Sequence, residues 1–225
     1  MCFSATASFV SGGLVSAVGV ATLFETRHPR QILFASLPLL FGLHQLEEGV
    51  AWLALEGEIA PAAGTAAKWA YIIFAHALLP TLSPLSILLI ERSRWRARVL
   101  MAFLALGLAI SAYTIWMLFQ YPIEYEIFNH SIVYYDGITG SGFFSTLYAI
   151  ATCGPLFFSG YRWIVVFGVL NLLALAFTAL VKQLAFTSVW CAFAAVASVF
   201  ILLHFHYVMR HEDYSAPSSM SAAGC

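Results

Sequence analysis

Charged side chains are scarce in this chain of 225 residues, where they make up 9% of the sequence. Water-soluble domains carry about 25% charged residues and roughly 45–50% apolar ones, whereas 61% of the side chains here are hydrophobic. This composition excludes a soluble enzyme, a nucleic-acid-binding protein and a disordered chain. It predicts an integral membrane protein whose main partner is the lipid bilayer.

Cysteine is also scarce, and the four thiols (Cys2, Cys153, Cys191 and Cys225) lie far apart in the sequence. Their spacing excludes a disulfide-rich scaffold and a zinc ribbon. The sequence also lacks the ten-residue alternation of apolar and polar side chains that is typical of a membrane barrel. The remaining way to cross lipid is a bundle of helices.

Long apolar stretches are abundant, and seven of them approach the roughly 20 residues that a membrane-spanning helix needs. The predicted fold is therefore all-α, a single domain over residues 1–214 that forms a bundle of seven transmembrane helices, with a flexible cytoplasmic tail over 215–225. The predicted spans are residues 4–24, 31–55, 68–90, 97–120, 141–160, 162–181 and 184–208.

Basic residues predict the orientation of this bundle. Seven spans place eight arginines on one side of the membrane and only Lys68 and Lys182 on the other. Cytoplasmic loops are enriched in basic residues, so we expect the N-terminus outside and the C-terminus in the cytoplasm. The arginines are Arg27, Arg30, Arg92, Arg94, Arg96, Arg98, Arg162 and Arg210.

Two further stretches have a structural interpretation. Ser8, Gly12 and Ser16 recur every four residues, which predicts a helix face that packs closely on a neighbouring helix. The outer loop at 121–140 is rich in tyrosine, isoleucine and acidic residues. We expect this loop to fold back as a cap over the outer mouth or to lie in the membrane interface.

The second predicted span carries four polar residues, His44, Gln45, Glu47 and Glu48. Spacings of three and four place His44, Glu47 and Glu48 near one helical face. A charge at this depth costs on the order of 3 kcal/mol or more, so such groups face the interior of a bundle and find partners there.

Depth along the helices suggests which partners these are. At 1.5 Å per residue, Glu48 and His76 lie roughly 10 Å and 12 Å below the outer surface, and Cys191 lies at roughly 10 Å. Cys2 falls at the outer mouth, where we expect its sulfur near that of Cys191, in a disulfide or as a second soft metal ligand. We therefore expect one polar layer in the outer third of the bundle.

Several functions fit such a layer. The leading hypothesis is a transporter- or channel-like protein that handles protons, ions or a small molecule, with Glu48, Glu47, Gln45 and His76 as its site. A rival is an intramembrane enzyme that uses a transition metal or haem. Its candidate ligands are His44, Glu48, His76, Cys191 and Cys2.

Two other interpretations stay open. One is a non-catalytic membrane subunit or sensor, with a protein partner or a second copy of the chain. The other is a single buried Glu–His hydrogen bond that fixes two helices and has no further role. At the opposite end, His204 and His206 are two residues apart and cannot share a helical face, so we expect them at the cytoplasmic interface.

The sequence also resembles a family of small bacterial multi-spanning membrane proteins that begin MCFSATASF, as this chain does at Met1–Phe9. The residues Gln45-x-x-Glu48-Gly49-x-x-Trp52 and Trp190-Cys191 are similar to that family as well. The resemblance implies a multi-pass protein of the bacterial inner membrane. It implies no activity, because none is assigned to the family.

Overall fold

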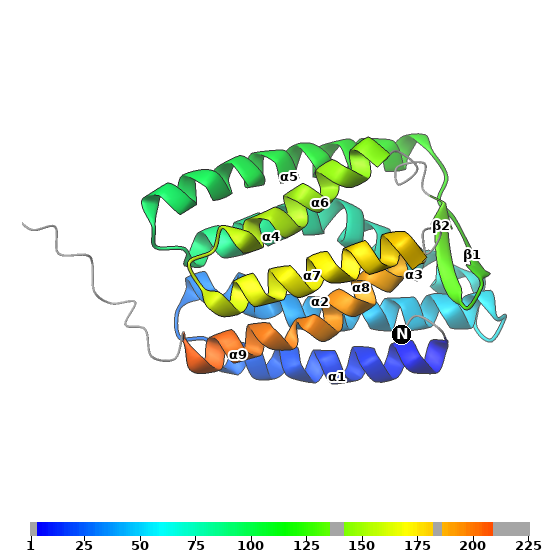
Figure 1. The fold of residues 1–225 in the computed structure, drawn as a ribbon. Coiled ribbons are helices and arrows are strands. Elements are labelled where there is room, and N and C mark those ends of the chain that lie inside the picture. Colours follow the sequence, from blue (N-terminus) through cyan, green and yellow to red (C-terminus); the bar gives the residue numbers. More distant parts are fainter. Residues whose placement is uncertain (1–3, 136–141, 182–185, 209–225) are drawn as a thin grey trace, which may run out of the picture.

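The computed structural model describes residues 4–135, 142–181 and 186–208. The protein is mostly helical, and its helices lie side by side, with α5 along one edge and α1 along the opposite edge (Figure 1). The helices before the hairpin are α1 (Ala5–Phe24), α2 (Pro29–Leu55), α3 (Pro61–Ile72), η1 (Ile73–Leu78), α4 (Leu79–Ile90) and α5 (Arg94–Gln120). The remaining helices are α6 (Gly142–Phe157), α7 (Arg162–Val181), α8 (Phe186–Ala197) and α9 (Val199–Tyr207).

Among the described residues, five helices are long and apolar enough to cross a membrane. They are Ala5–Phe24, Pro61–Ile90, Arg94–Gln120, Arg162–Leu180 and Val189–Tyr207. Helix α2 has the necessary length at 27 residues, but its polar residues at positions 44–48 lower its mean hydropathy. Helix α6 is apolar and has 16 residues, so it falls short in length alone.

The ends of the helices follow from local sequence signals. The His28 side chain accepts a hydrogen bond from the backbone of the first turn of α2, where Gln31 completes a capping box and Pro29 begins the helix. Pro61 begins α3 in the same way. This helix therefore starts seven residues before the expected position 68, and it continues through η1 and α4 to Ile90.

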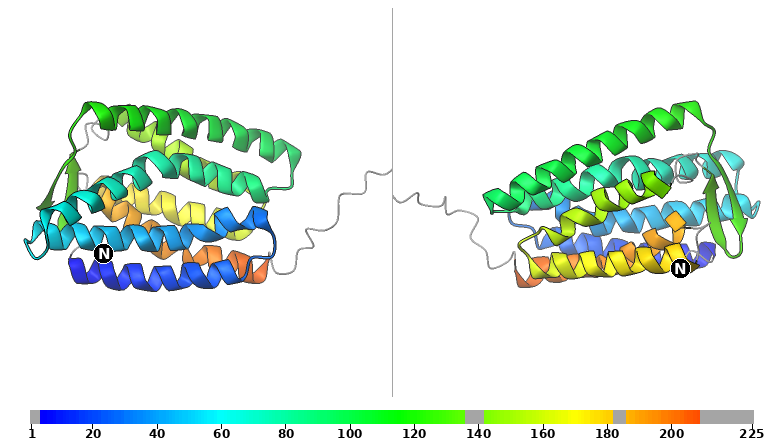
Figure 2. Two further views of the ribbon diagram at one scale, coloured as in Figure 1. Left: turned by 180° about the vertical axis from the view of Figure 1, so that it is seen from behind. Right: turned by 45° about the horizontal axis from the view of Figure 1, so that its top comes forward.

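A two-stranded hairpin departs from the predicted all-α class. Strands β1 (Glu124–Phe128) and β2 (Ser131–Tyr135) pair antiparallel across a two-residue turn. Both turn residues, Asn129 and His130, have positive φ, as the commonest hairpin turn requires. The hairpin crosses one end of the bundle, as the views in Figure 2 also show, and β2 is buried from Ser131 to Tyr134. The described part of the expected outer loop therefore covers one end of the bundle, and residues 136–140 of that loop lie outside the described residues.

Helices α1 and α2 pack with almost no side chain between them. A Cβ atom on Gly19 would lie 2.2 Å from the backbone nitrogen of Leu39, and one on Gly42 would lie 2.4 Å from the Ser16 hydroxyl. Ser8 and Gly12 are buried on the same face of α1. The stripe of small residues is therefore a packing face, as its spacing predicted.

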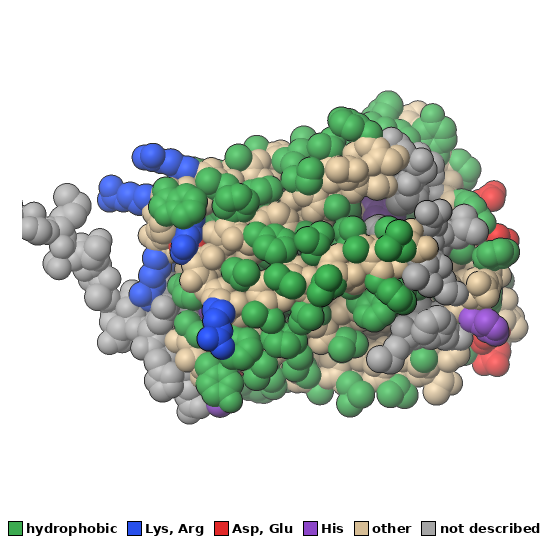
Figure 3. Space-filling view, viewed as in Figure 1, with side chains coloured by type: hydrophobic (Ala, Val, Ile, Leu, Met, Phe, Trp, Pro, Cys, Tyr) green, Lys and Arg blue, Asp and Glu red, His purple; other side chains and the backbone are tan. Residues whose placement is uncertain are grey.

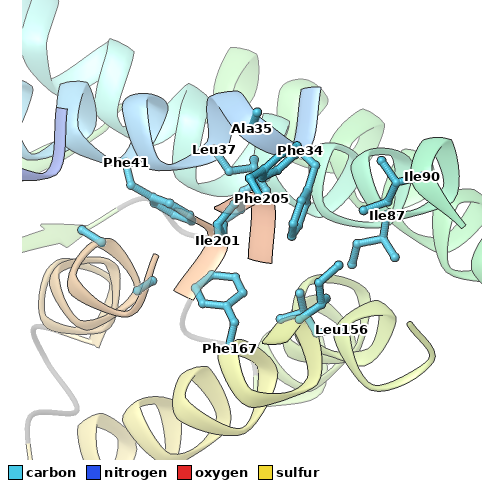
Figure 4. Close-up of a cluster of buried hydrophobic side chains, with 14 of the residues drawn as sticks. Phe34, Ala35, Leu37, Phe41, Ile87, Ile90, Leu156, Phe167, Ile201 and Phe205 are labelled. Atoms are coloured by element: carbon cyan, nitrogen blue, oxygen red, sulfur yellow. The ribbon is translucent and has the colours of Figure 1, made fainter. Parts of the chain in front are cut away.

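The main apolar core joins α2, α4, α6, α7 and α9 (Figure 4). Charged side chains lie at the two ends of the molecule, with arginines at one end, acidic residues at the other, and a hydrophobic belt between them (Figure 3). The arginine end holds the α1–α2, α4–α5 and α6–α7 connections. The hairpin covers the acidic end.

Candidate functional site

The polar residues of α2 are buried in the half of the bundle nearest the hairpin. Gln45 and Glu48 are completely buried, and His44 is 1% exposed. His76, which η1 contributes, is 4% exposed. The expected polar layer of His44, Gln45, Glu48 and His76 thus lies inside the protein, with groups from two helical segments.

His44 is held by aromatic rings and by one carboxylate. Its ring stacks on Tyr71 with 3.9 Å between centroids and also contacts Phe74 at 4.8 Å. Its Nδ1 lies 3.5 Å from a carboxylate oxygen of Glu47, whose side chain is 33% exposed. Glu47 therefore lies at the edge of the layer and turns partly outward, because consecutive residues point about 100° apart on a helix.

Cys191 brings α8 into the same site. The residue is 3% exposed, packs in the same cluster as Tyr71 and lies within electrostatic range of Glu48. His76 in turn lies within electrostatic range of His44. Titratable imidazole, carboxyl, thiol and phenol groups therefore lie in one buried region of the bundle.

The segment that carries His76 is a π-helix, Ile73–Leu78, inserted between α3 and α4. The Tyr148 hydroxyl of α6 donates a hydrogen bond to the Ala75 carbonyl in this segment. The Tyr148 ring meets the His76 ring edge-on at 5.9 Å and the Trp190 ring at 5.8 Å. Single π-helical turns inside α-helices are frequent at functional sites, and this one presents His76 to the layer.

Tyr71, Tyr148 and Trp190 belong to the site although sequence reasoning did not select them. Each is at most 7% exposed. Aromatic residues are common in this chain, and no spacing rule separated these three from the rest. The family resemblance included Trp190 without a role, and the crossing of α3, α6 and α8 beside His76 and Cys191 places all three at the site.

An aromatic column separates the layer from the hairpin end. Tyr134 of β2 stacks on Tyr71 at 4.5 Å, and Tyr125 of β1 stacks on Tyr134 at 6.2 Å. The Lys68 ammonium lies 5.3 Å from the centroid of the Tyr125 ring and donates a 2.6 Å hydrogen bond to the Ile123 carbonyl. Partial burial raises the pKa of Tyr125 above its ordinary value.

Some buried polar atoms of α1 and α2 have no hydrogen-bond partner among the described residues. They are the two amide atoms of Gln45, the Nε2 atom of His44 and the hydroxyl of Ser8. Buried polar groups in proteins are nearly always paired with protein, water or ligand atoms. These donors and acceptors are therefore available to a polar species bound next to Glu48.

A cavity of about 30 Å³ adjoins the layer at Trp190 and Cys191. It extends toward Phe167 and Asn171 in the middle of the bundle. One water molecule needs about 10–15 Å³ by this measure, so the cavity has room for a water beside the Cys191 thiol. Most of its lining is apolar.

The proposed metal ligands are only partly gathered. No group of three histidine, cysteine or acidic side chains among the described residues has the arrangement of a metal site. Cys2 lies outside the described residues, and with it the expected pairing to Cys191 and the full ligand set. The described geometry therefore gives the hypothesis of a metal ion held by three or more side chains no support.

The histidines of α9 behave differently from one another. His206 is exposed, and its Nδ1 lies 3.2 Å from a carboxylate oxygen of Glu25. His204 is completely buried and meets the rings of Tyr161 and Phe34 at 4.9 Å and 5.9 Å. His204 thus lies near the α6–α7 connection at the arginine end, but its side chain is buried in the protein because α9 packs that face into the apolar core.

Comparison with known proteins agrees with the resemblance seen in the first residues. No curated protein and no solved structure matches the chain. One family model, described as a family of unknown function (DUF6629), matches residues 1–217. The chain therefore belongs to the DUF6629 family.

Proposed function

We propose that this protein is a transporter- or channel-like protein of the bacterial inner membrane in which Glu48 takes up and releases a proton. The observation that carries the proposal is the complete burial of Glu48, within range of Cys191, in a layer that also holds His44 and His76. An ionisable group at such a depth in a membrane protein marks an ion or proton path.

The same proposal assigns seven spans to the chain. Five helices meet the length and hydropathy of a span, and α2 and α6 supply the other two. Polar residues inside α2 are compatible with a span because they face the interior of the bundle. The arginines at one end favour that end as the cytoplasmic one, with the N-terminus outside and the hairpin over the outer mouth.

A proton or a small polar solute fits the layer better than a metal ion. The side chains around Glu48 are of types that exchange protons, and the unpaired amide of Gln45 can both donate and accept a hydrogen bond. The described residues do not present three metal ligands together. A carboxyl beside imidazoles can change its protonation state when a solute binds or leaves.

Flux through reconstituted protein tests this proposal. Purified protein in liposomes that enclose a pH-sensitive dye should dissipate an imposed pH gradient faster than empty liposomes. Glu48→Gln should remove most of that flux, because an amide cannot carry the proton. Glu56→Gln is the control, because it removes an exposed carboxylate at the end of α2 outside the layer, and it should retain the flux.

Two results would contradict the proposal. One is a flux in Glu48→Gln equal to that of the parent protein. The other is no flux in the parent under any imposed gradient of protons or of small solutes, with the protein correctly folded and inserted.

A further inference from the structure

One carboxylate accepts three backbone hydrogen bonds at the arginine end of the molecule. Glu91, between α4 and α5, accepts hydrogen bonds from the backbone amides of Ser93 at 2.9 Å and Arg92 at 3.1 Å. Its second oxygen accepts one from the Gly160 amide at 2.8 Å. Gly160 lies between α6 and α7, so Glu91 joins two connections that are 69 residues apart.

Five arginines lie in these two connections or near the starts of the helices that follow them, α5 and α7. Arg92, Arg94, Arg98 and Arg162 are exposed, and Arg96 is half-buried. A Cβ atom on Gly160 would lie 2.3 Å from a guanidinium nitrogen of Arg96, so this side chain lies directly against the α6–α7 connection. Figure 3 shows basic side chains clustered at this end of the molecule.

Backbone dipoles add to this positive charge. Helix α5 begins at Arg94 and α7 begins at Arg162. No side chain caps the first turn of α5, which leaves backbone N–H groups directed outward. Helix N-termini with free N–H groups attract anions, phosphate groups in particular.

The use of arginine rather than lysine at this end indicates which kind of ligand these side chains bind. Every Lys or Arg residue near the connections at this end is an arginine, whereas one of the two lysines of the chain, Lys68, lies in α3 and the other is Lys182. The rule that relates basic loops to membrane orientation counts lysine and arginine alike, so it does not explain the preference. Arginine binds phosphate oxygens in a two-pronged geometry that lysine cannot form.

Two tryptophans next to these arginines indicate their level relative to the membrane. The Trp95 ring is 57% exposed and lies 5.3 Å from the Arg96 guanidinium. The Trp163 ring lies 5.5 Å from the Arg162 guanidinium. Tryptophan rings gather at the level of the lipid headgroups, which is where the phosphates of the bilayer lie.

We propose that the α4–α5 and α6–α7 connections form a binding site for a phosphate group, with Arg94, Arg98 and Arg162 as its main contacts. Its position at headgroup level points to an anionic phospholipid, and free inorganic phosphate offers the same chemistry. The proposal depends on membrane insertion but not on proton exchange at Glu48. A negative result in the flux experiment would therefore not contradict the phosphate-binding proposal.

Thermal unfolding in zwitterionic detergent micelles tests the site. Phosphatidylglycerol, phosphatidylcholine and inorganic phosphate are titrated separately into the parent protein and into Arg94→Gln/Arg98→Gln/Arg162→Gln. The control is Arg27→Gln/Arg30→Gln, which removes two exposed arginines from the α1–α2 connection at the same end. Size-exclusion chromatography and circular dichroism check that each variant is folded, and the three single variants replace the triple one if it is not.

We expect phosphatidylglycerol to raise the unfolding temperature and phosphatidylcholine to leave it unchanged. The triple variant should bind phosphatidylglycerol on the order of 100-fold more weakly, and the control should bind it within a few-fold of the parent. Added salt should weaken binding to the parent. A shift with inorganic phosphate alone that the triple variant loses supports the same site with a soluble anion as its ligand.

Three results would overturn the proposal. They are no shift with either phosphatidylglycerol or phosphate, an equal shift in the parent and the triple variant, and a loss in the control as large as that in the triple variant. Membrane insertion is tested separately by alkaline carbonate extraction, which releases peripheral proteins but not integral ones.

Discussion

Close packing of α1 on α2 makes a quantitative prediction about two glycines of the same helix. In Gly19→Ala, the new Cβ atom would lie 2.2 Å from the Leu39 backbone nitrogen, whereas ordinary contact begins at 3.4 Å. The helices must therefore separate locally by about 1.2 Å, the difference between 3.4 Å and 2.2 Å. Overpacking of this kind costs about 1–3 kcal/mol.

Gly13→Ala is the matched control for this substitution. Nothing lies within 4 Å of a Cβ atom at Gly13. Both substitutions gain the same helix propensity, about 1 kcal/mol, so this gain cancels when the two variants are compared. The difference between their free energies of unfolding measures the packing cost alone.

Thermal unfolding in mild detergent is the assay. Gly19→Ala should unfold roughly 2–12 °C below Gly13→Ala, at about 2–4 °C per kcal/mol for a chain of this size. Gly12→Ala should fall between them, because its Cβ atom would meet the movable end of the Leu46 side chain at 2.7 Å. If Gly19→Ala unfolds at or above the temperature of Gly13→Ala, the described α1–α2 interface is wrong.

Three further predictions concern other parts of the chain. Tyr148→Phe should lower the free energy of unfolding by about 1–3 kcal/mol, because it removes the donor to the Ala75 carbonyl in a buried site; a variant as stable as the parent in chemical denaturation would contradict this contact. The hydrogen bond from Tyr135 to Glu126 raises the pKa of Tyr135, because the carboxylate favours the protonated phenol. Glu126→Gln should therefore lower the pKa of Tyr135, as read by ultraviolet absorbance against Tyr135→Phe, and an unchanged titration would refute the contact. Cys153 and Cys191 are buried, so a polar maleimide should leave both unlabelled in intact protein and label both after denaturation, as mass spectrometry would show.

Burial of the polar layer could be predicted from sequence because it depends on two simple quantities. The cost of charge in lipid requires Glu48 to face inward, and the rise per residue of a helix fixes depth. These arguments identified Glu48, His76 and Cys191, which are all buried. The start of α3 was placed seven residues too late, so the depth estimated for His76 from the start of its helix was too small by about 10 Å.

Features that arise from contacts between distant segments could not be predicted in this way. The π-helical turn around His76 lies beside Tyr148 of α6, and nothing in the local sequence signals it. His204 is buried because α9 packs against Phe34 of α2, although its place near the end of a span suggested an interface. Glu47 belongs to the predicted polar face but turns partly outward. Residue spacing places a side chain on one side of a helix, but it does not fix how deeply that side chain is buried.

The central claim is that buried Glu48 exchanges a proton, and infrared difference spectroscopy tests it most directly. The parent protein, Glu48→Gln and the control Glu56→Gln, which changes an exposed carboxylate at the end of α2, would be titrated across about pH 5–9, where a perturbed carboxyl can change state. We predict a carboxyl band that changes with pH in the parent and in Glu56→Gln and is absent from Glu48→Gln. A band in Glu48→Gln that titrates as it does in the parent would contradict the claim.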